Sequence, residues 1–295
     1  MKSPDRGLPT RLAIAVPLAV LAACGTAAIA PAATQPAART VSARPVAVVA
    51  ARPLPARANA KVTVTARGTK VPGAPNCTMF PADNIWNTDI SKLPVNRHSA
   101  AWLRSMDSAS TNLHPDFGPN SGGFPFGIPY TIVSNAHPLV HIKFQYAGES
   151  NKGPYPFGPG TQIEGGKHAG GDRHAIMVNK NTCTLYELWH ARYSAKGSTA
   201  GSGAIWHLTS NKLRHAGWTS ADAAGLPILP GLLNYNQVRA AVKSGKPITH
   251  AIRFTAQQTQ SAFVWPARHQ AGSGSNPNLP PMGARFRLKD RKSVV

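Results

Sequence analysis

One stretch, residues 161–193, constrains the fold of this chain more than any other. Within it, residues 172–178 and 184–190 are typical of two short strands. Residues 179–182 (NKNT) lie between them, and asparagine tolerates the positive φ that tight turns need. A glycine-rich segment comes before the first strand. The stretch therefore predicts a loop that leads into a β-hairpin.

Short strands are also predicted elsewhere, whereas helix is rare. The other predicted strands are residues 130–133, 139–147, 203–208, 248–255, 262–266 and 283–289. Helices are predicted at 98–106 and 235–243, and residues 219–222 resemble a capped helix start. With 26 glycines, 27 prolines and 15% charged residues, the composition favours strands and loops over a helical bundle. The expected fold is all-β, a jelly-roll-like β-sandwich with long Gly/Pro-rich loops and one or two short helices.

The first 75 residues do not have the composition of a folded domain. Three basic residues precede a short apolar run, residues 12–23, which is the pattern of an export signal and is too short to span a bilayer. The run ends in LAACG, which resembles a bacterial lipobox and implies a lipid on Cys24; a plain signal cut near Ala30 is the alternative. We expect a signal peptide over 1–24, a disordered Ala/Pro/Arg-rich tether over 25–75, and an extracytoplasmic protein that is lipid-anchored or secreted.

The folded domain is expected over residues 76–289, and it contains two cysteines. With Cys24 assigned to the lipid, Cys77 and Cys183 are the thiols left over, and two such thiols usually pair in an oxidising compartment. A Cys77–Cys183 disulfide would join the start of the domain to the central hairpin. The final residues, 290–295 (DRKSVV), match a translated sequencing adapter, so we expect them to be the non-native tail of a truncated reading frame.

The chain carries 32 Lys/Arg against 11 Asp/Glu, a net charge of +21. Residues 76–295 hold 22 of these basic residues and ten of the acids, so the domain is basic by itself. A basic domain attracts anionic polymers and lipids, although exported proteins are often basic without such a role. No Lys/Arg-rich run with interleaved aromatics occurs, which argues against nucleic acid as a partner. We expect a monomer that binds a polysaccharide or cell-wall glycan and contacts the membrane through its lipid anchor only.

Five motifs resemble a family of uncharacterised secreted bacterial proteins. They are PADNIWN (81–87), GDRH (171–174), LYEL (185–188), AGWTSADAAGLP (216–227) and VWPARH (264–269). The resemblance covers residues 76–289 and implies no reaction, but it implies that longer members continue beyond residue 283. A second, local resemblance is YELW (186–189), which is similar to the strand with the nucleophilic glutamate in jelly-roll cellulases. The tryptophan stands closer to the glutamate here than in those enzymes.

A glycoside hydrolase needs two carboxylates across the scissile bond, one of them held protonated. The acid-poor domain offers three catalytic candidates: Glu187, Glu164 and Asp172. Because side chains alternate along a strand, Leu185, Glu187 and Trp189 share one face. If that face lines a groove, Glu187 is aimed at substrate beside a sugar-stacking ring. If it is core, Glu187 pairs with an arginine such as Arg173. The candidate sugar platforms are Trp189, Trp206 and Tyr155.

Three other functions stay open. A polysaccharide lyase would neutralise a uronate with Arg173 and use a base such as His174, but no diagnostic spacing is present. A metal site would require five dispersed residues to converge, namely His168, Asp172, His174, His190 and His207. Their spacing is not that of a ligand set, so no metal or cofactor is expected. A non-catalytic glycan-binding or structural envelope protein is the alternative from another class. The favoured function is cleavage of a polysaccharide with paired carboxylates.

Overall fold

The computed structural model describes residues 68–113, 118–121 and 124–288. The expected signal peptide with Cys24, most of the expected tether and the suspected tail at 290–295 lie outside these residues. Strand β1 (Lys70–Val71) pairs antiparallel with β2 (Ala74–Thr78), and the Val71 side chain is buried. The boundary expected at residue 76 is therefore too late, because Val71 already packs in the core.

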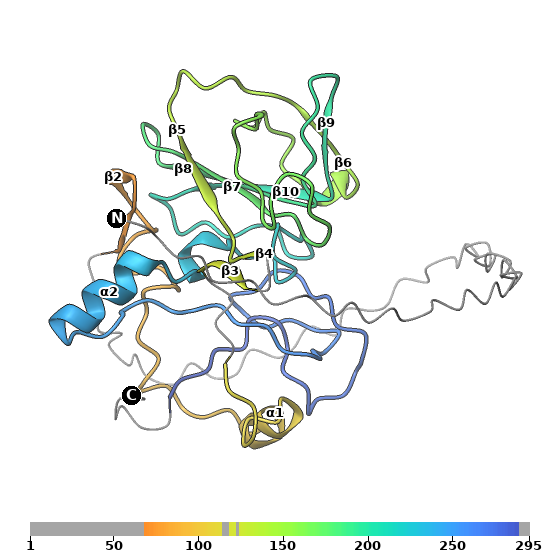
Figure 1. Cartoon of the computed structure of the whole chain (residues 1–295). Helices are drawn as coiled ribbons and strands as arrows, with labels where there is room; N and C mark the ends of the chain where they lie inside the picture. Colours follow the sequence, from red (N-terminus) through yellow and green to blue (C-terminus); the bar gives the residue numbers. More distant parts are fainter. Residues whose placement is uncertain (1–67, 114–117, 122–123, 289–295) are drawn as a thin grey trace, which may run out of the picture. The chain divides into compact units, whose positions relative to one another are not determined.

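A four-stranded sheet with the order β10-β8-β7-β5 lies at the centre of the described residues (Figure 1). Its strands are β5 (Tyr130–Val133), β7 (Ala175–Asn179), β8 (Thr184–Trp189) and β10 (Ser202–His207). The strands β7, β8 and β10 pair antiparallel, whereas β5 runs parallel to β7. The predicted hairpin is confirmed as β7 and β8. Its turn is stabilised by the Asn179 side chain, which accepts hydrogen bonds from the backbone N–H groups of Asn181 and Thr182.

Smaller elements surround this sheet. They are the strands β3 (Gly118–Ser121), β4 (Phe124–Phe126), β6 (Ile142–Phe144) and β9 (Ser198–Ala200), the α-helices α1 (Ser99–Ser105) and α2 (Tyr235–Ser244), and the 3-10 helices η1 (Ala147–Glu149) and η2 (Leu229–Gly231). Strands thus outnumber helices, which confirms the mostly β character. None of the helices within the described ranges has the length and apolar character that crossing a membrane requires.

Both predicted helices are confirmed, and α2 shows the clearest end signals. The Asn234 side chain accepts a hydrogen bond from Gln237 N–H, and the Gln237 side-chain oxygen accepts one from Asn234 N–H, which together form a capping box. Gly245 ends the helix in the left-handed region at φ 64°, where a residue without Cβ is favoured.

Several predicted elements are wrong. Residues 248–255, 262–266 and 283–288 form no strand within the described chain, where only isolated bridges such as Phe263 with Met282 occur. Residues 219–222 begin no helix. The Ser220 hydroxyl accepts a hydrogen bond from Asp222 N–H and donates to backbone carbonyl oxygens in the same segment, which stabilises a tight turn instead.

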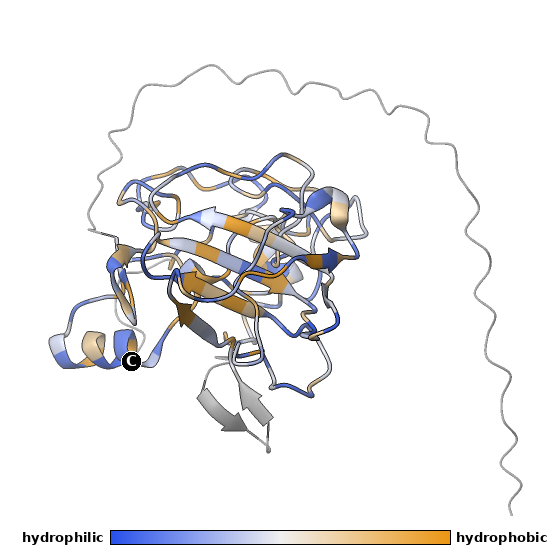
Figure 2. Cartoon of the chain, turned by 90° about the horizontal axis from the view of Figure 1, so that it is seen from above, coloured by the Kyte–Doolittle hydropathy of each residue, from blue (hydrophilic) through white to orange (hydrophobic). Residues whose placement is uncertain are grey.

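Both faces of the central sheet are buried. Leu185 and Ile176 pack on one face with residues of 71–86 and 221–232, whereas Leu188 and Met177 pack on the other with Tyr155 and Phe157. Figure 2 shows the hydrophobic residues gathered along these strands. The predicted division of β8 into two faces is therefore confirmed. The Glu187 face is closed along the strand interior, whereas the other face leaves Tyr186 half-buried.

The predicted disulfide is confirmed: Cys77 on β2 is bonded to Cys183 in the β7–β8 turn. It links residues 106 positions apart in the sequence and joins the first hairpin to the central one. The Cys77 side chain is fully buried in the core that covers the Leu185 face of the sheet.

Candidate functional site

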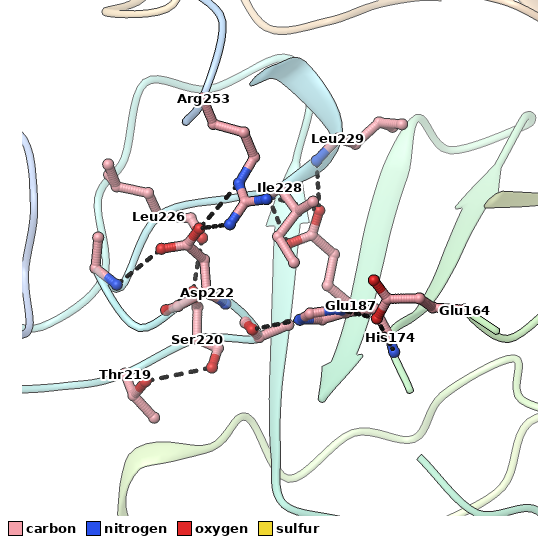
Figure 3. Close-up of polar contacts among 12 residues, drawn as sticks. Glu164, His174, Glu187, Thr219, Ser220, Asp222, Leu226, Ile228, Leu229 and Arg253 are labelled. Atoms are coloured by element: carbon pink, nitrogen blue, oxygen red, sulfur yellow. Dashed lines mark hydrogen bonds and ion pairs between the residues drawn. The ribbon is translucent and has the colours of Figure 1, made fainter. Parts of the chain in front are cut away.

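Glu187 lies in the middle of β8 and is completely buried, at 0% exposure. Ile228 N–H donates to its carboxylate oxygens over 2.9 and 3.0 Å, and Leu229 N–H donates to Oε1 over 2.9 Å. These two amides open η2, and the first N–H groups of a helix have no acceptor within it. A carboxylate at that position satisfies them with charge-assisted hydrogen bonds. Glu187 thus attaches the segment that contains Ile228 and Leu229 to β8, as Figure 3 shows.

Opposing effects set the pKa of Glu187. Burial raises the pKa to about 7, because the charged form loses its hydration, while the hydrogen bonds from Leu229 and Ile228 act in the opposite direction. The carboxylate of Asp222 raises the pKa further, and His174 lowers it. A fully buried carboxyl group is therefore close to half-protonated at neutral pH.

Of the two arrangements weighed for the Glu187 face, a groove and a core, the described residues form the core. The face of β8 that carries Glu187 is covered by residues 221–232, which belong to the same core cluster as Leu185. Arg173, the partner expected for a buried Glu187, is not bonded to it. Its guanidinium donates to the backbone oxygens of Ala169, Ala191 and Lys167 over 2.6, 3.1 and 3.2 Å. The partners of the buried Glu187 carboxylate are therefore the backbone amides of Ile228 and Leu229 and not an arginine.

The role of Arg173 is to hold the glycine-rich loop. This side chain is buried, and burial lowers its pKa. Its acceptors Lys167 and Ala169 lie in the loop, and Ala191 lies just after β8, so the guanidinium ties the loop to the end of the sheet. A buried guanidinium with several carbonyl acceptors is satisfied without a carboxylate. The uronate-neutralising role considered for Arg173 would require its N–H groups to leave these carbonyls.

His174 and Glu164 form a second polar contact beside Glu187. His174 Nδ1 lies 2.6 Å from Glu164 Oε2, and Nε2 lies 3.1 Å from the carbonyl oxygen of Ala221. Burial lowers the pKa of His174, but the hydrogen bond and charge of Glu164 outweigh it, so the pKa is raised. Burial raises the pKa of Glu164, and His174 outweighs that effect, so the pKa is lowered. Both ring nitrogens face oxygen atoms, and the raised pKa of His174 and the lowered pKa of Glu164 favour the pair of imidazolium and carboxylate.

Further side chains attach the segment from Thr219 onward. The Ser202 hydroxyl on β10 donates to the Ser220 carbonyl oxygen over 2.6 Å. Arg253 donates through Nε and Nη2 to Asp222 Oδ2, over 3.1 and 2.7 Å, while Ala224 N–H donates to Asp222 Oδ1. Figure 3 shows these contacts converging on one segment from strands and loops that are far apart in sequence. This segment includes the motif at 216–227, and three of the other four motifs contact it, through His174, Glu187 and Arg268, whose N–H donates to the Ala224 carbonyl oxygen.

An exposed polar and aromatic surface lies at the end of β8. Trp189 is half-buried, and its indole N–H donates to Asp172 Oδ1 over 3.0 Å. Tyr146 is 45% exposed, and its ring centre lies 6.2 Å from that of Trp189. The ring of His190, the residue after β8, has its centre 5.6 Å from that of Trp189. We call Tyr146, Asp172, Trp189 and His190 the aromatic surface. It combines two rings with a carboxylate and an imidazole that solvent can reach.

Gly201 gives Trp189 its position. A Cβ atom on Gly201 would lie 2.1 Å from Cε3 of Trp189, far inside contact distance, so the ring rests directly on the glycine backbone. Gly201 also accepts a hydrogen bond at its carbonyl from Tyr146 N–H and donates its own N–H to the Trp189 carbonyl. The backbone at residue 201 therefore holds both rings of the aromatic surface.

Tyr146 is a site residue that the sequence pattern does not indicate. Alternation along residues 139–147 places it on the buried side of a strand, together with Ile142 and Phe144. Strand β6 ends at Phe144, however, and η1 begins at Ala147, so the alternation stops before Tyr146 and the ring turns outward. The strand pattern alone carries no signal for that change.

The other two expected sugar platforms are corrected by their burial. Tyr155 is 0% exposed, and its hydroxyl donates to the Asn151 carbonyl oxygen. Trp206 is buried on the Leu185 face of the sheet, with the Arg214 guanidinium 5.7 Å from its ring centre. Neither ring can reach a polysaccharide, because each belongs to one of the two cores. Of the three expected platforms, Trp189 alone contacts solvent.

The residues weighed as metal ligands are not brought together. Within the residues that the structure describes, no group of three or more His, Cys, Asp or Glu side chains has the proximity that a metal ion requires. His174 is engaged with Glu164 and Ala221, and Asp172 with Trp189. A groove of about 250 Å³ lies elsewhere, beside η2, and its lining is mostly apolar, including Met79, Ile128 and Leu232. None of the candidate catalytic residues lines it.

No family model, no curated protein and no solved structure matches this chain. The resemblances noted from the sequence therefore depend on the motifs themselves.

The pKa of Glu187 predicts that the protein loses stability as pH rises. Its pKa is about 7 in the folded state against 4.5 for the ordinary group, so the folded state binds this proton more tightly. The contribution is present below pH 4.5 and is lost on going from pH 4.5 to above 7, by about 3 kcal/mol. The raised pKa of His174 acts in the same direction, whereas the lowered pKa of Glu164 opposes it at acid pH.

Chemical denaturation at pH 5 and pH 8 measures this effect. The free energy of unfolding should be higher at pH 5, and Glu187→Gln should flatten the dependence, because the amide does not titrate. An equal slope in the wild type and Glu187→Gln would assign the pH dependence to other groups.

Proposed function

We propose that this protein binds a polysaccharide through the aromatic surface and does not use Glu187 as a catalyst. The observation that carries the proposal is the arrangement of Trp189, Tyr146 and Asp172 at an exposed end of the sheet. Aromatic rings pack against the C–H faces of sugars and, being rigid, lose little conformational entropy on binding. A carboxylate accepts hydrogen bonds from sugar hydroxyls.

The carboxylates themselves favour binding over cleavage. Glycoside hydrolysis needs one protonated carboxyl group and one ionised carboxylate on either side of the glycosidic bond. Glu187 has a raised pKa but is enclosed by Ile228 and Leu229. Glu164 reaches solvent in part, but it is held as the carboxylate partner of His174. Asp172 is then the single expected catalytic carboxylate that solvent reaches freely, and one such group does not supply both functions.

The basic charge of the domain favours an anionic glycan. Arg192 is exposed and lies 3.4 Å from the His190 ring through Nη2, which places a cation beside the aromatic surface. A cation there would pair with a uronate or a phosphate of a cell-wall polymer. We therefore propose a polysaccharide or cell-wall glycan with acidic groups as the ligand.

The setting of this binding is also a proposal. The lipobox resemblance at Cys24 supports an exported protein that is lipid-anchored or secreted, working as a monomer at the cell envelope. A β-sandwich of the jelly-roll type is likewise a proposal, supported by the predominance of strands over helices. Mass measurement of the mature protein for a diacylglyceryl group on Cys24 tests the anchor directly.

We expect Trp189→Ala to weaken glycan binding about 10- to 30-fold, the range for losing a central aromatic contact. Gly201→Ala should weaken it as well, because the added methyl group displaces the Trp189 ring. Gly148→Ala is the matched control, since a Cβ atom there meets nothing within 4 Å. Affinity electrophoresis in gels containing a neutral β-glucan or a polyuronate measures the effect, and equal migration of all three variants in every gel contradicts the proposal.

The same preparation distinguishes binding from cleavage. Binding alone releases no reducing ends and produces no ultraviolet absorbance of unsaturated uronates. Release of reducing ends that Asp172→Asn abolishes would instead support a hydrolase, and absorbance of unsaturated products that His174→Gln abolishes would support a lyase.

A further inference from the structure

The helix α2 has an apolar ridge that the rest of the described chain does not cover. It has no buried residue, and Tyr235 and Val242 are 73% and 80% exposed. They are seven positions apart, so two helical turns place them on the same side. Val238 and Ala241 are half-buried, which shows that a different side faces the domain. In Figures 1 and 2 the helix stands to the side of the central strands.

A basic ridge runs beside the apolar one. Arg239 and Lys243 are exposed and follow Tyr235 by four and eight positions, so they lie on the adjacent side of the helix. Lys246 is exposed just after the helix ends at Gly245. The surrounding sequence adds no compensating charge: residues 223–288 contain seven Lys/Arg and neither Asp nor Glu. The surface on this helix is therefore both cationic and apolar.

The helix is held in place without using either ridge. Its first turn is fixed by the capping box between Asn234 and Gln237, and Gln237 Nε2 lies 3.1 Å from the His250 ring. The preceding residues are attached through Leu229 to Glu187. Because these anchors lie at the N-terminal end, the exposed ridges are presented on a fixed helix.

We propose that α2 rests on an anionic phospholipid bilayer. A helix with cationic side chains beside apolar ones lies in a membrane interface, with the cations near lipid phosphates and the apolar side chains in the boundary layer. Tyrosine suits that layer because its ring is apolar and its hydroxyl is polar. An anionic polysaccharide would satisfy Arg239 and Lys243 and would pack a sugar on the Tyr235 ring, but it would leave the aliphatic Val242 side chain in water. This contact is additional to any lipid on Cys24.

A local probe separates this contact from membrane binding by the N-terminal residues. The full chain with Cys24→Ala and Asn236→Cys is labelled at residue 236 with a polarity-sensitive fluorophore, with Cys77 and Cys183 left oxidised. Asn236 is exposed and lies outside the apolar ridge. We expect the emission to shift to the blue on adding phosphatidylglycerol vesicles and to stay unchanged with phosphatidylcholine vesicles. A label at the exposed Lys180 in the β7–β8 turn should not respond.

Two pairs of substitutions test the two ridges in the labelled chain. The double substitution Arg239→Gln with Lys243→Gln should raise the vesicle concentration that gives half of the shift about 10- to 30-fold at low salt. The reason is that each cation near an anionic membrane surface strengthens binding several-fold. Tyr235→Ser with Val242→Ser should reduce the shift itself. Lys152→Gln with Lys212→Gln removes the same charge from exposed positions elsewhere and should change neither quantity.

Three results would overturn the proposal. The first is a label at residue 236 that does not respond to phosphatidylglycerol. The second is an equal response from the label at residue 180, which would place the whole domain against the vesicle without orientation. The third is a response that depends on the basic pair alone and that soluble polyphosphate reproduces, which would identify a polyanion and not a bilayer as the occupant.

Discussion

Removing the Cys77–Cys183 disulfide is expected to lower the free energy of unfolding by about 4–5 kcal/mol. The bond closes a loop with a sequence separation of 106 residues, and cross-linking so long a loop removes much of the conformational freedom of the unfolded chain. The folded state changes little, because Cys77 is packed in the core and alanine fills part of the same space. The loss therefore arises mainly in the unfolded state.

Equilibrium unfolding in urea of the Cys77→Ala/Cys183→Ala variant measures this loss. Reduction of the wild type with dithiothreitol should reproduce it, while Cys24→Ala should leave the unfolding free energy of the oxidised domain unchanged. Comparable midpoints for the wild type and the double variant would show that loop closure contributes little here.

Replacing Glu187 with alanine is expected to cost about 3–4 kcal/mol of stability. The change leaves the Ile228 and Leu229 N–H groups buried without an acceptor, and each unsatisfied group costs about 1–3 kcal/mol. It also creates a cavity between β8 and η2. Burial disfavours the charged form of Glu187, so removing the carboxyl group recovers part of this cost.

Glu187→Gln should cost less than Glu187→Ala, because its oxygen can still accept from both amides. The remaining cost comes from the side-chain NH₂ group, which would face the Ile228 N–H. Glu164→Gln is a useful comparison, since that side chain is partly exposed and should cost less than either change at Glu187. Thermal and urea unfolding give the order of the three variants. An alanine variant as stable as the wild type would contradict the anchoring role of Glu187.

The local features of the central hairpin could be predicted from sequence because they depend on neighbours in the chain. Asparagine at 179 and 181 favours the turn, and the alternation of residues 184–189 fixes which side chains share a face. The ends of α2 follow from Asn234 and Gly245 for the same reason. The pairing of Cys77 with Cys183 needed only a count of cysteines and an oxidising compartment.

The predicted strands near the C-terminal end failed for a physical reason. Residues 248–255 and 262–266 have strand-like composition, but a strand forms only where a neighbour offers its backbone groups. Arg253 N–H donates to the Gly231 carbonyl oxygen and its side chain to Asp222, so this segment is held by scattered contacts instead of a ladder. Composition does not report whether a partner strand is in reach.

The sequence by itself determined that Leu185, Glu187 and Trp189 share a face, but it could not determine what covers that face. A period of two says which side chains point together and says nothing about the segment that packs on them. Residues 221–232, some 40 positions away, cover Glu187 and leave Trp189 at the rim. The tertiary structure alone therefore decided that the glutamate is an anchor and that its neighbour, two residues on, belongs to the surface proposed to bind glycan.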